Sequence, residues 1–147
     1  MKVIIAERKN ASSIRKGRTS FSDAIRQATL IFVVVPRDNE TINMISTPEL
    51  EVMDNTVNIV NTGRGGVVNE EAVAQALKDG KIGGFATDVY AVEPATRETS
   101  VLLDETIPNL ILSPHIAWYS SRTLNGTVEV LKDNIEGFVS GKPQNVL

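Results

Sequence analysis

Five short apolar runs, each followed by a turn or by a segment with helical periodicity, constrain the fold of this chain more than any other feature. We expect strands at Val3–Ala6, Leu30–Val35, Val57–Val60, Gly84–Val89 and Leu110–Leu112. Because the runs are almost continuously apolar, both of their faces are expected to be buried. Such strands, alternating with helices, favour an α/β fold with a parallel sheet and helices on both faces.

Four segments carry the start and stop signals of helices. The expected helices run from Ser20 to Gln27, from Thr47 to Met53, from Asn69 to Lys78 and from Ser121 to Val139. Ser20, Thr47 and Asn69 are suitable N-caps, and Pro48 suits the first helical position. The last helix carries an apolar stripe with i, i+4, i+7 spacing, and we expect residues 121–140 to dock on a partner chain.

Composition limits the function classes. The 147 residues, at 41% hydrophobic and 22% charged, fit a single soluble globular domain over residues 1–147. A formal net charge of -3 disfavours a nucleic-acid partner, which would need a basic face. The apolar runs are too short to span a bilayer, and the N-terminus lacks a signal-peptide pattern, so a cytoplasmic protein without a membrane partner is expected.

The chain contains no cysteine and a single histidine. Disulfides and thiolate chemistry are therefore excluded, and no metal site is expected.

Polar residues follow three of the expected strands. Asn61–Gly66 comes after the third strand, Asp88 and Glu93 after the fourth, and His115 after the fifth. Parallel sheets bind ligands at the carboxyl ends of their strands, so these residues are expected to converge. Taken singly, each has an ordinary structural role open to it, such as a solvated arginine or a surface glutamate. One shared site is a simpler explanation than four unrelated roles.

The same segments resemble a known family. Asn-Thr-Gly-Arg-Gly-Gly-Val-Val-Asn-Glu at residues 61–70 resembles the arginine signature of D-2-hydroxyacid dehydrogenases. Residues 84–94 resemble that family's aspartate-to-glutamate segment, and residues 113–118 its histidine signature. Residues 3–18 and 134–146 look most like the glycerate dehydrogenase, hydroxypyruvate reductase and glyoxylate reductase branch. The resemblance covers essentially the whole chain.

The resemblance implies roles for three catalytic residues. Arg64 would bind the carboxylate of a 2-keto acid and polarise its keto oxygen, because a guanidinium presents donors in a fixed fork. His115 would give or take the hydroxyl proton. Glu93 would hydrogen-bond His115, raising its pKa and fixing its orientation.

The resemblance also implies a dinucleotide cofactor, NAD or NADP. Glu7 would end the strand that holds the adenosine ribose, and Arg8 beside it would favour the 2′-phosphate of NADP. Pro36 would line the adenine pocket, and Asp88 would lie beside the nicotinamide. The full set implied for cofactor binding is Glu7, Arg8, Pro36, Thr62, Gly63, Asp88 and Trp118.

The sequence lacks the family's first strand and its G-x-G-x-x-G loop. That loop normally holds the cofactor's pyrophosphate at a helix N-terminus, so we expect dinucleotides to bind this chain weakly. The family's first strand is also the central strand, and without it the sheet would expose unpaired edges. We therefore expect a partial Rossmann-like sheet in which either Val3–Ala6 moves beside Leu30–Val35 or a second chain completes the sheet. Either arrangement is expected to form a homodimer.

Three function hypotheses follow. The first is an NAD(P)-linked oxidoreductase acting on a small 2-keto or 2-hydroxy acid. The second is an enzyme without a dinucleotide, in which Arg64, Glu93 and His115 serve as an acid–base set that isomerises, cyclises, dehydrates or decarboxylates a carbonyl compound. The third is a non-catalytic binding protein, like the related C-terminal-binding-protein corepressors.

Overall fold

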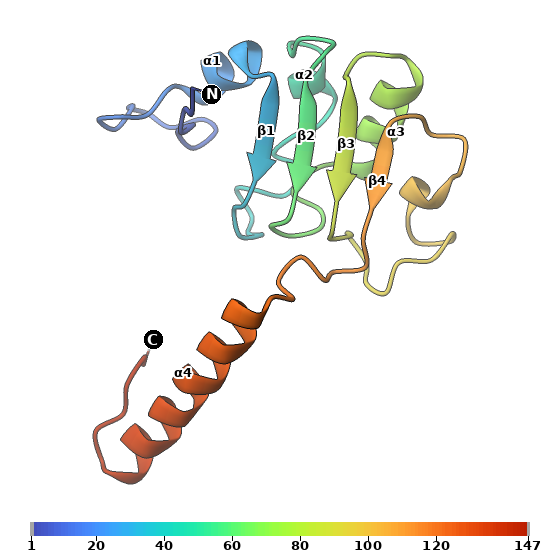
Figure 1. Ribbon diagram of the computed structural model, residues 1–147. Coiled ribbons are helices and arrows are strands. Elements are labelled where there is room, and N and C mark those ends of the chain that lie inside the picture. The colour runs from blue at the N-terminus through green and yellow to red at the C-terminus, as the bar shows by residue number, and fades with distance from the viewer. Residues whose placement is uncertain (1, 147) are drawn as a thin grey trace. The chain divides into compact units, whose positions relative to one another are not determined.

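The computed structural model describes residues 2–146 of the chain, which divide into two compact units (Figure 1). The first unit ends at Pro114, and the second begins at His115. The first unit contains the sheet and every helix except the last one. The single-domain organisation expected from the sequence stays a prediction.

A four-stranded parallel sheet forms the first unit, in the order β1-β2-β3-β4 (Figure 1). The strands are β1 Leu30–Val33, β2 Asn58–Asn61, β3 Gly84–Thr87 and β4 Leu110–Leu112. All three pairings are parallel, and the last residues of β2 and β3, Asn61 and Thr87, lie opposite each other. The parallel sheet predicted from the apolar runs is confirmed, and its carboxyl ends share one edge.

The helices begin and end close to the predicted residues. They are α1 Phe21–Gln27, α2 Thr47–Leu50, α3 Glu70–Lys78 and α4 Ser121–Val139, with a short 3-10 helix, η1, at Val101–Leu103. The predicted N-caps of α1 and α3 are confirmed, because Ser20 Oγ accepts from Asp23 N at 3.1 Å and Asn69 Oδ1 accepts from Ala72 N at 2.8 Å.

The predicted N-cap of α2 is wrong by one residue. Ser46 is the cap and Thr47 is the first helical residue. The reason is a capping box, in which the backbone N–H of Ser46 donates to Glu49 Oε2 at 3.1 Å. The helix also ends at Leu50, three residues before the predicted end.

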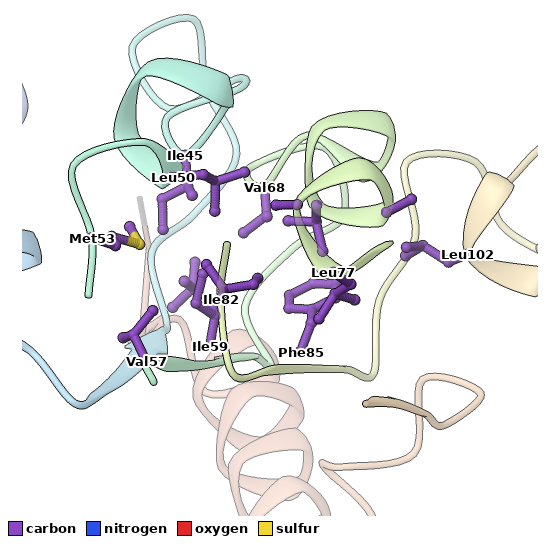
Figure 2. Packing of buried hydrophobic residues seen from close by; sticks show 14 of the residues in the cluster. Ile45, Leu50, Met53, Val57, Ile59, Val68, Leu77, Ile82, Phe85 and Leu102 are labelled. Atoms are coloured by element: carbon purple, nitrogen blue, oxygen red, sulfur yellow. The ribbon is translucent and has the colours of Figure 1, made fainter. Parts of the chain in front are cut away.

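The hydrophobic core lies between one face of the sheet and the helices α2 and α3, with η1 at its end (Figure 2). Ile59 and Phe85 project from β2 and β3, and Leu77 projects from α3. Alternate residues of each strand reach this core, so the strands are held in register by the residues they bury. This packing fixes the positions of the strand ends, from which the polar residues project.

One edge and one face of the sheet remain uncovered in the first unit. Strand β1 pairs only with β2 among the described strands. Phe32, next to that edge, is 59% exposed, and Ile111 on the same face is 70% exposed. Val34, just past β1, is 70% exposed. Apolar side chains this exposed on a parallel sheet are unusual, because such sheets are normally covered on both faces.

The predicted strand at Val3–Ala6 is wrong, and so is its predicted place beside Leu30–Val35. Only Ala6 forms a β-bridge, and its partner is Thr19. The backbone N–H of Thr19 donates to the Ile5 carbonyl at 3.0 Å, so the chain folds back on itself here. This local turn satisfies backbone groups that a neighbouring strand would otherwise pair.

Candidate active site

The turn that carries Arg64 is held together by the last residue of β2. The Asn61 side chain is buried, with Oδ1 accepting from Gly63 N and Nδ2 donating to the Arg64 carbonyl, each at 3.1 Å. The Arg64 guanidinium donates to the Gly63 carbonyl at 2.7 Å, and the residue as a whole is exposed. The turn therefore presents a cation at the carboxyl edge of the sheet while its own backbone is fixed.

Two glycines allow this turn to pack closely against neighbouring backbone. A Cβ at Gly63 would lie 2.9 Å from the Val35 carbonyl oxygen. A Cβ at Gly65 would lie 1.7 Å from the Tyr90 carbonyl oxygen, a separation that no side chain tolerates. The Arg64 turn is thus packed directly on the segment that leads from Asp88 to Glu93.

Asp88 follows β3 and is buried, with an exposed fraction of 3%. Its Oδ1 accepts a hydrogen bond from Ser113 Oγ at 2.5 Å, and the Tyr90 hydroxyl donates to the Ser113 carbonyl at 3.2 Å. The Thr87 hydroxyl fixes the turn that follows β3, because it accepts a hydrogen bond from Val89 N and donates one to the Val89 carbonyl. These bonds tie the end of β3 to the segment after β4.

Glu93 is oriented by its own loop, with Oε1 accepting from Tyr90 N at 2.9 Å. Burial raises the pKa of the Tyr90 hydroxyl, and the charges of Asp88, Glu70 and Glu93 raise it further. The structure therefore gathers three carboxylates around one tyrosine.

Glu70 supports this loop and was missed by the sequence analysis. It is 7% exposed, and its carboxylate accepts from Ala91 N at 2.6 Å and from Ser100 Oγ at 2.5 Å. A glutamate in the first turn of a helix ordinarily faces solvent and complements the helix dipole. Only the contacts across the fold reveal that Glu70 holds the segment between Ala91 and Ser100.

His115 begins the second unit, three residues after the end of β4. Its φ is 55°, a left-handed conformation that is uncommon outside glycine and is often found at functional sites. Its carbonyl accepts a hydrogen bond from Trp118 Nε1 at 2.8 Å. Trp118 in turn makes an edge-to-face contact with Tyr119 at a centroid distance of 5.5 Å. His115 and Trp118 thus belong to one local turn.

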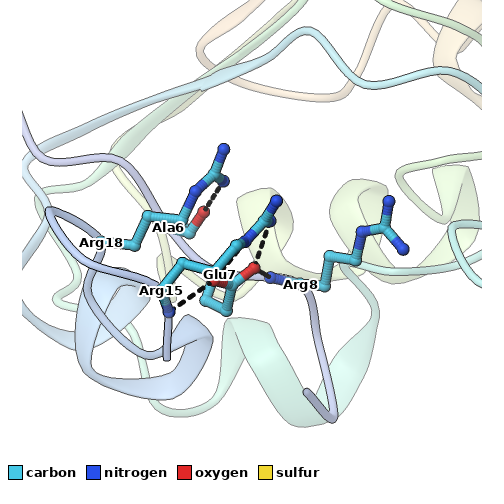
Figure 3. A network of polar contacts seen from close by, with 5 residues as sticks. All are labelled: Ala6, Glu7, Arg8, Arg15 and Arg18. Atoms are coloured by element: carbon cyan, nitrogen blue, oxygen red, sulfur yellow. Dashed lines mark hydrogen bonds and ion pairs between the residues drawn. The ribbon is translucent and has the colours of Figure 1, made fainter. Parts of the chain in front are cut away.

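Glu7 lies at the centre of a second polar network (Figure 3). Glu7 is 4% exposed, and its carboxylate accepts four hydrogen bonds, one from Arg8 N and three from Arg15. The side-chain bond from Arg15 is the largest cause of a pKa for Glu7 far below the usual glutamate value. The same bond raises the pKa of Arg15. The pair fixes the loop from Glu7 to Arg18.

A groove of about 990 Å³ separates this loop from β1. Its walls are residues 2–9, helix α1, strand β1 and the segment from Val34 to Ile45, so Pro36 lies on one wall and Arg8 on the other. The lining of the groove is largely apolar, with basic residues contributed by the Glu7–Arg18 loop. That shape and chemistry fit the adenosine end of a dinucleotide.

The pH dependence of stability tests the Glu7 network. Because Glu7 has a lowered pKa in the folded state, its stabilising effect is present above the unfolded pKa of about 4.3 and is lost as pH falls below it. Glu7→Gln should therefore unfold at lower urea concentration than wild type at about pH 7, with the difference shrinking toward about pH 3. Glu51→Gln, at an exposed position, is the control. A constant difference across this range would contradict the assignment.

The predicted site residues thus fall into three sets. Thr62, Gly63, Arg64, Asp88 and Glu93 lie together at the carboxyl edge of the sheet, and Glu7, Arg8 and Pro36 line the groove. His115 and Trp118 follow β4 in the second unit. Within residues 2–146, no helix is long and apolar enough to cross a membrane.

Comparison with known proteins extends these observations. The model of the D-isomer specific 2-hydroxyacid dehydrogenase NAD-binding domain matches residues 1–117. Glycerate dehydrogenase from Methylorubrum extorquens is 43% identical over 131 residues, covering 89% of this chain and 41% of that protein. Glyoxylate reductase from Pyrococcus horikoshii is 33% identical over 120 residues, covering 82% of this chain and 35% of that protein.

A solved structure agrees with the fold. A D-isomer specific 2-hydroxyacid dehydrogenase family protein from Aeromonas salmonicida superimposes with a TM-score of 0.79 at 27% identity, covering 99% of this chain and 46% of that one. The chain therefore spans less than half the length of the relatives that it matches. The resemblance stated from the three sequence motifs is confirmed, including the glycerate dehydrogenase and glyoxylate reductase branch.

Proposed function

Because the chain belongs to the D-isomer specific 2-hydroxyacid dehydrogenase family, we propose that it supplies the cofactor domain and the catalytic groups of an NAD(P)-linked oxidoreductase. The observation that carries this proposal is the packing of Gly65 on Tyr90, which sets the Arg64 turn against the loop of Glu93. The reaction interconverts a small 2-keto acid and the corresponding 2-hydroxy acid.

Arg64 binds the substrate in this proposal. Its guanidinium donates one hydrogen bond to the Gly63 carbonyl, which leaves its other N–H groups available to a substrate carboxylate. A guanidinium matches a carboxylate with two parallel hydrogen bonds, and it polarises the adjacent keto oxygen. Arg64 is exposed at the sheet edge, which supports this role. A substrate can reach the guanidinium from solvent, and the empty site leaves no buried, unpaired charge.

His115 carries the proton in this proposal, and Glu93 is its positioning residue. Reduction of a keto acid places negative charge on the keto oxygen, and an imidazolium beside that oxygen neutralises the charge by donating a proton. A carboxylate partner favours the charged imidazole and holds its orientation. The support is the loop that fixes Glu93 through Tyr90 N and the position of His115 shortly after β4.

In this proposal, different parts of the chain hold the two ends of the dinucleotide. The groove between the Glu7–Arg18 loop and β1 is proposed for the adenosine end, with Pro36 in its lining. Thr62 and Gly63 follow β2 and Asp88 follows β3, and these three are proposed for the nicotinamide end, as the family resemblance implies. The role of Trp118 stays a prediction from the sequence. The sequence has no G-x-G-x-x-G loop for the pyrophosphate. When bound, the nicotinamide cofactor supplies or accepts the hydride.

Turnover with a small 2-keto acid tests the proposal. Purified protein mixed with NADH or NADPH should oxidise the cofactor only when glyoxylate or hydroxypyruvate is added, as the named activities of the relatives suggest. Cofactor-independent turnover of a carbonyl compound would favour the repurposed acid–base enzyme instead. The matched family favours the oxidoreductase over that alternative and over a non-catalytic binding protein. A cytoplasmic location belongs to the same proposal.

We also propose that the chain forms a homodimer. Two apolar surfaces support this proposal. One is the unpaired edge of β1 with the exposed Phe32 and Val34 beside it, and the other is the exposed face of α4 with Leu131, Ile135 and Phe138. Unpaired strand edges and exposed apolar patches commonly mark protein–protein interfaces. Light scattering should give twice the 16.0 kDa mass of one chain. Phe32→Lys should shift the mass toward one chain, whereas Val101→Lys at another exposed site should not. A wild-type monomer would contradict the proposal.

A further inference from the structure

We propose that Glu70 is a positioning residue for Glu93, and that it acts by holding the peptide group between Tyr90 and Ala91. The inference rests on the proposed function, in which Glu93 orients His115. It depends on contacts between segments that are far apart in the sequence, all of them within the first unit.

Glu70 is a buried carboxylate without a cationic partner. It is the first residue of α3, and the neighbouring Glu71 is exposed, as a carboxylate in the first turn of a helix usually is. Among the described residues, no lysine or arginine forms an ion pair with Glu70. Its Oε1 accepts from Ala91 N at 2.6 Å, and its Oε2 accepts from Ser100 Oγ at 2.5 Å. Because burying a carboxylate is costly, these two hydrogen bonds are what keeps Glu70 turned inward.

The peptide group that Glu70 holds is also the one on which the Arg64 turn packs. The Tyr90 carbonyl and the Ala91 N–H belong to one planar group. A Cβ at Gly65 would lie 1.7 Å from the Tyr90 carbonyl oxygen and 2.7 Å from Ala91 N. The group is therefore fixed by Glu70 at its N–H and by Gly65 at its carbonyl.

This fixed peptide group adjoins the amide that binds Glu93. Tyr90 N donates to Glu93 Oε1 at 2.9 Å, so consecutive amides donate to two different carboxylates. The two peptide groups share the Cα of Tyr90, and only two dihedral angles separate them. Without Glu70, the Ala91 N–H would lose its acceptor, and the segment that orients Glu93 would be free to turn.

Reach rather than charge is what these contacts require. The Glu70 side chain spans from Ala91 to Ser100, and Ser100 is also the N-cap of η1. A glutamine has the same reach: its carbonyl oxygen accepts from Ala91 N, and its amide N–H donates to the Ser100 hydroxyl, which is able to accept. An aspartate keeps the charge but is one methylene shorter, so it does not span the two contacts.

Amide hydrogen exchange of the full chain, followed by NMR, tests the inference without a cofactor. Glu70→Asp should speed exchange of the Tyr90 amide roughly 10- to 100-fold, the range for loss of a charge-assisted contact. The Phe85 amide, which donates to the Asn109 carbonyl, should change much less. Glu70→Gln should leave the Tyr90 amide within about threefold of wild type. Glu71→Asp, the same change at the exposed neighbouring position, should match wild type at both amides.

Turnover gives a second measurement on the same variants. Glu70→Asp should lower kcat for glyoxylate reduction roughly tenfold or more and change KM much less, because Glu93 is displaced while Arg64 still binds the substrate. Glu70→Gln should keep most of the wild-type kcat, since it has the reach of glutamate.

An unchanged Tyr90 amide in Glu70→Asp would overturn the inference. A loss of equal size at the Phe85 amide would do the same, because it would indicate a general loss of stability. So would a normal kcat in Glu70→Asp when the wild type is active, or a defect in Glu70→Gln that Glu70→Asp does not share. Absence of turnover by the wild type counts against the proposed function, whereas the exchange rates still decide whether Glu70 holds this segment.

Discussion

Replacing His115 with alanine is expected to lower the rate of cofactor-dependent 2-keto acid reduction by about 10²- to 10⁴-fold, the usual contribution of a positioned acid–base group. The variant loses the proton donor but keeps Arg64, so KM for glyoxylate should change much less than kcat. Steady-state kinetics with NADH and NADPH measure both constants.

Two further variants define the role of Glu93 in the same assay. Glu93→Gln keeps the size of the side chain and its acceptor for Tyr90 N, but it removes the charge that favours a protonated histidine. It should therefore lower kcat for 2-keto acid reduction more than it changes KM. Arg122→Gln, at an exposed position near the start of α4, is the matched control and should behave as wild type. Retention of most of the activity in His115→Ala would contradict the proposed mechanism.

Replacing Gly65 with alanine is expected to destabilise the first unit by about 3 kcal/mol or more, or to prevent its folding. The added Cβ would lie 1.7 Å from the Tyr90 carbonyl oxygen. The Cβ position is fixed by the backbone of residue 65 and the neighbour is itself a backbone atom, so no side-chain rotation relieves the overlap. Because this contact joins the Arg64 turn to the Glu93 loop, any folded fraction should also lose affinity for glyoxylate. Urea denaturation and NMR titration measure the two effects.

Gly80→Ala is the matched control for this substitution. Gly80 lies in the same unit with a φ of 64°, and no atom lies within 4 Å of the position that its Cβ would occupy. The substitution should therefore cost about 1 kcal/mol, from backbone strain alone. Equal losses in Gly65→Ala and Gly80→Ala would show that the contact with Tyr90 contributes little.

Local signals were enough to predict most of the elements. The bounds of β4 and α4 agree with the sequence prediction, because apolar periodicity and the stop signals at Pro114 and Gly141 are local properties of the chain. The strand predicted at Val3–Ala6 failed because a strand also needs a partner, and here the nearest backbone is that of Thr19. Apolar composition alone carries no information about that partner.

The residues of the candidate site could be predicted from the sequence, but the contacts that hold them in place could not. The turn with Arg64 and the segment with Glu93 follow neighbouring strands, so their convergence follows from a parallel sheet. The contacts of Glu70 with Ala91 and Ser100 join residues that are 21 and 30 positions apart, and no local pattern predicts them. The same holds for Arg15, whose bond to Glu7 changes the expected chemistry of that carboxylate.

Titration of the purified chain with NADH and NADPH, followed by nicotinamide fluorescence, tests the central claim most directly. We expect saturable binding of at least one of the two cofactors, with a Kd in the range from about micromolar to millimolar. If neither NADH nor NADPH showed saturable binding, the claim that this chain is the cofactor domain of a 2-hydroxyacid dehydrogenase would be contradicted.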